Sequence, residues 1–138
     1  MSAGYKIDKK HRLVLTAAWG LLTIADAIGH KERLLDDPDF DPDYCQILDF
    51  TRVTEVDLTA DELVKFAEFD VFSPRSRRAL VVPHDATFGL GRMFEFLRDR
   101  RGESGIRVCL TVEEALTWVL RSTSGYGTFR DRTKETPE

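Results

Sequence analysis

The sequence predicts a single α/β domain: a five-stranded mixed sheet with about four helices. After two initial strands, short apolar runs alternate with segments of helical periodicity, a pattern typical of a mostly parallel sheet covered by helices. The 138 residues, 42% hydrophobic and 32% charged, fit one globular domain of ordinary size. We expect the domain to span residues 1–120, followed by a polar, disordered tail over 121–138.

The first strands are expected at Tyr5–Asp8 and Leu13–Ala18, joined by the polar turn Lys9–Arg12. The apolar run Gln46–Phe50 predicts a third strand, and the polar residues after it predict a loop that ends where Thr59 can cap a helix.

Between the second and third strands, residues Ile24–Leu35 have helical spacing. Lys31 interrupts the apolar face of this helix, so its ammonium group would have to extend to the edge of the buried region. The expected buried face consists of Ile24, Ala27, Ile28 and Leu35, with Leu34 at its edge.

The second half of the chain alternates helices with strands. Ser73-Pro74 must end the helix before it, because proline restricts the preceding residue to extended backbone. The expected elements are a helix at Asp61–Glu68, a strand at Arg78–Val82, a helix at Asp85–Arg101, a strand at Ile106–Leu110 and a helix at Val112–Leu120.

Three threonines stand at helix starts. Thr23, Thr59 and Thr111 are each followed three residues later by an acidic residue, which is the capping-box pattern or a close variant of it. A phosphate on Thr59 is the competing interpretation, since a helix N-terminus favours negative charge. The repetition at three helices favours capping.

Composition narrows the class of protein. A net charge of −4 and a pI near 5.4 argue against a nucleic-acid partner. No apolar run approaches the roughly 20 residues needed for stable membrane insertion, and the first residues lack the apolar core of a signal peptide, so we expect a cytoplasmic protein. Cys45 and Cys109 are expected to be reduced core residues.

No pattern indicates a catalytic, metal or cofactor site. The acidic run at residues 36–43 lacks the glycine and glutamate of a calcium loop, and Gly89-Leu90-Gly91 lacks the third glycine of a dinucleotide motif. The histidines stand apart from one another in the sequence. An acid–base pair would have to come from Asp49, Asp57, His84 or Asp85.

Several aromatic residues fall outside the predicted core faces. They indicate either an apolar surface for a partner or ligand, or, for those that follow the second helix, side chains that fold inward. The candidate surface consists of Phe69, Phe72, Phe88, Gly89, Gly91, Arg92, Met93 and Phe96.

Three segments resemble a known family. LDFTRVTEVDLTADEL (residues 48–63) resembles the strand–loop–helix signature of STAS domains, the fold of sulfate transporters and anti-sigma-factor antagonists. YKIDKKHRLVLT (5–16) and FGLGRMFEFLRD (88–99) resemble the bacterial SpoIIAA-like, or STAS/SEC14-type, proteins. The resemblance covers about Gly4–Leu120 and implies a STAS-like fold.

This chain departs from the family pattern at one position. In phospho-switched antagonists a serine follows the aspartate that closes the loop, whereas this chain has Asp57-Leu58. The usual phospho-acceptor is therefore missing, and Thr59 is only a weak switch candidate.

These observations predict a non-enzymatic STAS-like interaction or regulatory module that forms a homodimer. The alternative is a carrier of a small apolar or lipid-like ligand, with a cavity between the sheet and the third helix near Gly89, Gly91, Met93 and Phe96. An enzyme is the third hypothesis. We expect no cofactor.

Overall fold

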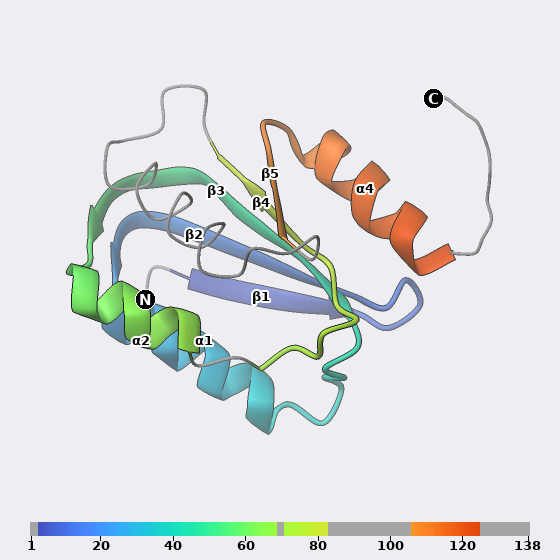
Figure 1. The fold of residues 1–138 in the computed structure, drawn as a ribbon, viewed down its shortest axis with the longest axis horizontal. Helices are drawn as coiled ribbons and strands as arrows, with labels where there is room; N and C mark the ends of the chain where they lie inside the picture. The colour runs from blue at the N-terminus through green and yellow to red at the C-terminus, as the bar shows by residue number, and fades with distance from the viewer. Residues whose placement is uncertain (1–2, 69–70, 83–105, 125–138) are drawn as a thin grey trace.

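The computed structural model describes residues 3–68, 71–82 and 106–124. They form a five-stranded mixed sheet and three helices (Figure 1), which confirms the predicted fold class. In chain order the elements are β1 (Ala3–Asp8), β2 (Leu13–Thr23), α1 (Ile24–Asp36), β3 (Cys45–Asp57), α2 (Ala60–Glu68), β4 (Arg78–Val81), β5 (Ile106–Cys109) and α4 (Val112–Ser124). The helix predicted at Asp85–Arg101 and most of the predicted tail lie outside the described residues.

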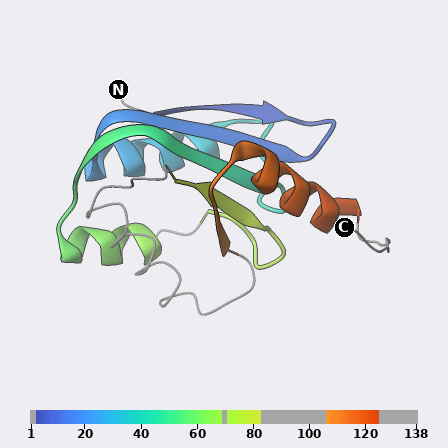
Figure 2. The same ribbon diagram turned by 90° about the horizontal axis from the view of Figure 1, so that it is seen from above.

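Every strand pairs with the strand before it in the chain. The sheet order is β1-β2-β3-β4-β5, with β1 antiparallel to β2 and the other three pairs parallel. Helices α1 and α2 lie side by side on one side of the sheet and α4 lies on the other (Figures 1 and 2). The described part of the domain therefore has three layers, with a core on each face of the sheet.

The two cores follow from strand alternation. On the α4 face, Leu13, Ile47 and Val81 pack with Ala115 and Val119 of the helix. The opposite core is formed by Ala3, Ala18, Leu22, Phe50, Val53, Leu80 and Val82. Successive residues of a strand point to opposite faces, so the apolar runs of β3 and β4 serve both cores.

Strands β2 and β3 are longer than predicted. β2 continues to Thr23 and β3 continues to Asp57, so the connection between β3 and α2 consists of Leu58 and Thr59 alone. The prediction of a polar loop after Phe50 was wrong. In the second half of β3 most residues are polar and exposed, while Val53 is buried. A strand with one face in solvent has many polar residues, and the sequence pattern was therefore interpreted as a loop.

The strand pair β2–β3 is irregular where it lengthens. The pairing register shifts between Ala17 and Trp19 and again between Gly20 and Leu21. Gly20 has a φ of 68°, a backbone conformation that residues with a Cβ rarely adopt. The glycine therefore allows β2 to continue through a bulge.

The buried face of α1 also differs from the prediction. Ala27, His30 and Leu34 are buried, whereas Leu35 is 52% exposed. The buried set still has helical spacing, but it includes a histidine, and this moves the face away from Leu35. Lys31 behaves as predicted, because it is half-buried with its ammonium group at the edge of the core.

Phe72 does not belong to a surface patch. Its side chain is 8% exposed and meets Phe40 edge to face, with ring centroids 5.3 Å apart. This aromatic follows the end of α2 and folds inward, as the alternative interpretation predicted. Cys45 and Cys109 are both free and buried, as expected.

Smaller boundary differences occur in the last elements. Leu110 lies outside β5 and is half-exposed, and α4 continues four residues beyond Leu120, to Ser124. None of the helices in the described ranges is long and apolar enough to cross a membrane.

Candidate functional site

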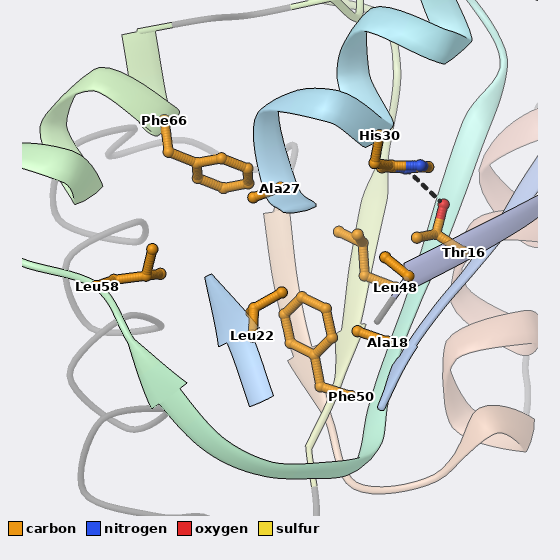
Figure 3. A pocket seen from close by; sticks show the side chains of 10 residues that line it. Thr16, Ala18, Leu22, Ala27, His30, Leu48, Phe50, Leu58 and Phe66 are labelled. Carbon is orange, nitrogen blue, oxygen red and sulfur yellow. Dashed lines mark hydrogen bonds between the residues drawn. The ribbon is translucent and has the colours of Figure 1, made fainter. Parts of the chain in front are cut away.

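A small cavity lies between the sheet and helices α1 and α2 (Figure 3). Its volume is about 30 Å³. Strands β1, β2 and β3 form one side, α1 and α2 the other, and the β3–α2 connection contributes Leu58. The lining residues are Ala3, Thr16, Ala18, Leu22, Ala27, His30, Leu48, Phe50, Leu58 and Phe66.

His30 is held in this cavity wall by a buried polar chain. Gln46 Nε2 donates a hydrogen bond to Thr16 Oγ1 at 2.9 Å, and Thr16 Oγ1 lies 3.1 Å from His30 Nε2 (Figure 3). The Tyr5 ring packs against the imidazole at a centroid distance of 5.4 Å. Gln46, Thr16 and His30, which are linked by these contacts, are all buried.

The surroundings keep His30 neutral. Burial, together with the smaller effects of the positive charges of Arg33 and Lys31, lowers the pKa of His30 to about 4. The imidazole is therefore uncharged at physiological pH.

One ring nitrogen of His30 is unsatisfied. Nδ1 is buried and has no hydrogen-bond partner among the residues that the structure describes. A buried polar atom without a partner loses its hydration without replacement, which is uncommon in folded proteins. One signal in the sequence indicated this position, since His30 lies at helical spacing between Ala27 and Leu34, but its partners on β2 and β3 could not be predicted.

The β3–α2 junction is the second candidate site. Thr59 Oγ1 accepts a hydrogen bond from the Glu62 amide at 3.1 Å, and Glu62 Oε1 accepts one from the Thr59 amide at 2.9 Å. This reciprocal pair confirms the predicted capping box. Thr23 and Thr111 accept from the amides of Asp26 and Glu114, so all three predicted threonine caps are confirmed.

The junction combines an apolar anchor with an acidic rim. Leu58 is half-buried and packs against the core on the α1–α2 face. Close to it in the sequence, Glu55, Asp57 and Asp61 are exposed. This side of the molecule therefore presents several carboxylates beside a helix N-terminus.

Acidic residues of the run 36–43 stabilise turns and form hydrogen bonds or ion pairs with other segments. The Asp37 and Asp41 carboxylates accept from backbone amides two residues ahead, as in Asx turns. Tyr5 donates to Asp37 at 2.7 Å, which lowers the pKa of that carboxyl group. Lys9 pairs with Asp39 at 3.3 Å.

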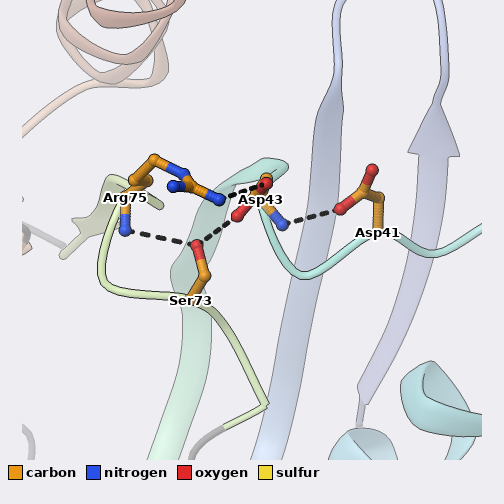
Figure 4. Close-up of polar contacts among 4 residues, drawn as sticks. All are labelled: Asp41, Asp43, Ser73 and Arg75. Carbon is orange, nitrogen blue, oxygen red and sulfur yellow. Dashed lines mark hydrogen bonds and ion pairs between the residues drawn. The ribbon is translucent and has the colours of Figure 1, made fainter.

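Asp43 joins this run to the chain that precedes β4 (Figure 4). It accepts from Ser73 Oγ at 2.5 Å and from Arg75 at 3.1 Å, and the Arg75 amide donates to Ser73 Oγ. The hydrogen bond from Ser73 and then that from Arg75 lower the pKa of Asp43. Within the described ranges, no group of three or more histidine, cysteine or acidic side chains is arranged to hold a metal ion.

The structure describes only some of the residues that the sequence suggested for a partner surface or an acid–base pair. Phe72 is in the core, and Thr59 caps α2. The candidate acid Asp49 accepts hydrogen bonds from Thr51, and Asp57 is exposed at the end of β3. The residues outside the described ranges are Phe69, His84, Asp85, Phe88, Gly89, Gly91, Arg92, Met93 and Phe96.

Comparisons with known proteins agree with the topology. No protein-family model matches the sequence, and no curated protein does so. The structure is similar to that of an uncharacterised protein of the DUF3478 family with a SpoIIAA-like fold from Shewanella loihica PV-4, with a TM-score of 0.57 and 16% identity over 86% of this chain and 94% of that chain. It is also similar to an anti-sigma factor antagonist from Mycobacterium paratuberculosis, with a TM-score of 0.56 and 15% identity over 86% and 94% of the two chains.

These similarities define a class of fold. The chain adopts a SpoIIAA-like, STAS-type fold, as the resemblance in the sequence implied. At such low identity the comparison concerns the fold alone, and function must be argued from the sites.

Proposed function

We propose that the protein is a non-enzymatic, cytoplasmic regulatory module that binds a partner protein through the β3–α2 junction. The observation that carries this proposal is the junction itself, where the exposed acidic residues Glu55, Asp57 and Asp61 flank the capped N-terminus of α2 in the sequence. One protein of similar structure is named for antagonising an anti-sigma factor, which is an action on another protein.

The junction acts without the usual phosphorylation switch. Leu58 occupies the position where the phospho-acceptor serine of antagonists would stand, and its side chain packs against the core. The Thr59 hydroxyl already accepts from the Glu62 amide. The Thr59 hydroxyl therefore has a structural role without a phosphate, and we propose that binding is regulated by the supply of the partner.

The partner surface is basic. Glu55, Asp57 and Asp61 are all exposed, and opposite charge across an interface accelerates association and favours the correct partner. We expect an affinity that falls as the salt concentration rises.

Charge reversal at the junction tests the proposal. Tagged wild-type protein and a Glu55→Lys/Asp57→Lys variant are used to capture partners from the native cell, and the captured proteins are identified by mass spectrometry. Glu32→Lys, on the exposed side of α1, is the matched control. We expect the wild type and the control to capture a common protein that the double variant loses. A partner retained by the double variant contradicts the proposed surface.

The homodimer is a further part of this proposal. Trp19 and Leu21 of β2 are 39% and 45% exposed, unusual for large apolar side chains on a strand. We propose that they meet a second copy of the chain. Sedimentation velocity of the wild type and of Trp19→Glu tests this, with a wild-type dimer and a monomeric variant expected. A wild-type monomer at all concentrations refutes the dimer.

A second candidate function is transport or sensing of a small apolar ligand. The cavity beside His30, against α1 and α2, favours it; the cavity suggested by the sequence involves Gly89, Gly91, Met93 and Phe96, which lie outside the described residues. A volume of about 30 Å³ is far below the roughly 300–1,000 Å³ of pockets for drug-sized ligands, which favours a small molecule over a lipid. Native mass spectrometry of the purified protein tests for a ligand that copurifies.

A further inference from the structure

We propose that two copies of this chain bind each other through the outer face of the long β2–β3 strand pair, with Arg52 of each copy against Glu55 of the other. This inference rests on the homodimer proposed above and specifies its contacts. The surface consists of four exposed residues, Trp19, Leu21, Arg52 and Glu55, which we call the outer patch.

The strand register places these residues on one face of the sheet. In the parallel pair of β2 and β3, Trp19 is aligned with Arg52 and Leu21 with Glu55. Arg52 and Glu55 are three residues apart, so in a regular strand their side chains would point to opposite faces. The register shift between Gly20 and Leu21 gives β3 one extra residue here, and both charges therefore point to the same face.

The core defines which face this is. Leu22, Val53 and Val56 pack into the core on the side of α1 and α2, so the outer patch lies on the opposite face of the sheet. Helix α4 packs on β3, β4 and β5 on that face, but it lies away from the ends of β2 and β3 that lead into α1 and α2 (Figures 1 and 2). Among the helices that the structure describes, none covers the outer patch.

Trp19 and Leu21 supply the apolar part of the patch. The Trp19 ring lies beside Gly4 of β1, where an added Cβ would be 3.7 Å from ring carbon Cη2. The ring therefore rests on the sheet, while much of its surface and that of Leu21 remain exposed. Covering both side chains removes apolar area from water, which is the dominant favourable term in most protein association.

Arg52 and Glu55 supply charges that can pair across an interface. Among the residues that the structure describes, neither of them forms an ion pair. A positive and a negative charge along one strand make the patch complementary to itself, because a second copy presents the same two charges in reverse order. This charge pattern favours a second copy over a different protein as the occupant.

A two-fold axis that runs across the strands satisfies all four residues. It reverses each strand relative to its copy, so Trp19 meets Leu21 of the second copy and Arg52 meets its Glu55. The symmetry repeats both kinds of contact. An axis along the strands instead places Arg52 on Arg52 of the second copy, or Leu21 on its Glu55, and either contact is unfavourable.

Exchange of the charges tests this pairing, with sedimentation velocity of the full chain over a range of concentrations. Arg52→Glu and Glu55→Arg each create like-charge contacts, so each variant alone should raise the dissociation constant of the dimer about 30-fold, the effect of losing two exposed ion pairs. An equal mixture of the two variants brings opposite charges together again and should dimerise as the wild type does. The double variant Arg52→Glu/Glu55→Arg should do the same.

Glu32→Arg, a charge reversal on the exposed side of α1, is the matched control and should leave the dimer unchanged. Circular dichroism verifies that each variant is folded. Three results overturn the pairing: the wild type stays monomeric, the single variants dimerise as the wild type does, or the single variants are monomeric and neither the mixture nor the double variant restores the dimer.

Glu55 also belongs to the proposed partner surface, and one variant separates the two roles. Arg52→Glu weakens the dimer but keeps Glu55, Asp57 and Asp61, so it should still capture the protein that Glu55→Lys/Asp57→Lys loses. A dimer restored by charge exchange, without such a captured protein, keeps this pairing and contradicts the partner site. Capture by Arg52→Glu together with a monomeric wild type does the reverse.

Discussion

Lys31 of α1 caps the neighbouring helix α2 through Phe66. Its ammonium group donates to the Phe66 carbonyl oxygen at 2.7 Å and lies 3.9 Å from the centroid of the Phe66 ring. The carbonyl belongs to the last turn of α2, where such groups lack intrahelical partners. One side chain therefore joins the two helices that cover the cavity.

Replacing Lys31 should loosen α2. Lys31→Met keeps much of the aliphatic stem but removes the charge, so we expect a loss of about 1–2 kcal/mol from the hydrogen bond and the cation–π contact together. Hydrogen exchange of the α2 amides should accelerate while exchange in β4 stays unchanged. Lys65→Met, an exposed lysine on α2, is the control. Equal effects from the two variants would show that the contact with Phe66 is not what holds the helix.

His30 should make the protein sensitive to mild acid. Its pKa falls from 6.5 to about 4 on folding, so the unfolded chain binds the proton first, and stability decreases as pH falls from about 6.5 toward 4. The full shift corresponds to roughly 3 kcal/mol. Urea unfolding of the wild type at pH 7 and pH 5 measures the decrease.

Two variants isolate the contribution of His30. His30→Leu should flatten the pH dependence between pH 7 and 5. His11→Leu, in the exposed β1–β2 turn where His11 contacts Asp8, is the comparison variant. An unchanged slope in His30→Leu would show that His30 is not the group that titrates.

The threonine caps should contribute similar amounts to stability. Each of Thr23→Ala, Thr59→Ala and Thr111→Ala should cost about 1 kcal/mol of unfolding free energy, since each removes a side-chain acceptor at a helix N-terminus. Thr59→Ser should retain most of the stability because it keeps the hydroxyl. Chemical denaturation compares them, and a Thr59→Ser variant as unstable as Thr59→Ala would contradict the capping role.

The link between Asp43 and Ser73 should order the chain before β4. Asp43→Asn removes the charge that accepts from Ser73 and Arg75, so the amides of residues 73–76 should exchange faster. Asp39→Asn, which removes an exposed ion pair with Lys9, should leave them unchanged. Exchange rates measured by NMR distinguish the two. Equal protection in Asp43→Asn and the wild type would assign the order of this segment to the buried Ser76 hydroxyl and its bond to the Tyr44 carbonyl.

The sequence predicted best what depends on neighbouring residues. The caps at Thr23, Thr59 and Thr111 involve hydrogen bonds within one helical turn, and the strands at the centre of the sheet are continuous apolar runs. Both signals depend on residues close together in the sequence, so they can be recognised without knowledge of the fold.

Features that depend on distant residues were missed. The second half of β3 was mistaken for a loop because only Val53 and Val56 reveal its inner face. The position of Phe72 depends on Phe40, and the environment of His30 depends on Thr16 and Gln46 from two other elements. Such contacts form only when the sheet is assembled.

The order of the strands has a consequence for how the chain assembles during its synthesis. Each of the described strands after the first pairs with the strand synthesised before it. The open edge of each strand is therefore paired by the next strand to leave the ribosome. None of them has to insert between two strands that are already joined. Growth from the N-terminus can thus proceed by successive addition, which shortens the time for which an open β edge is available to other nascent chains.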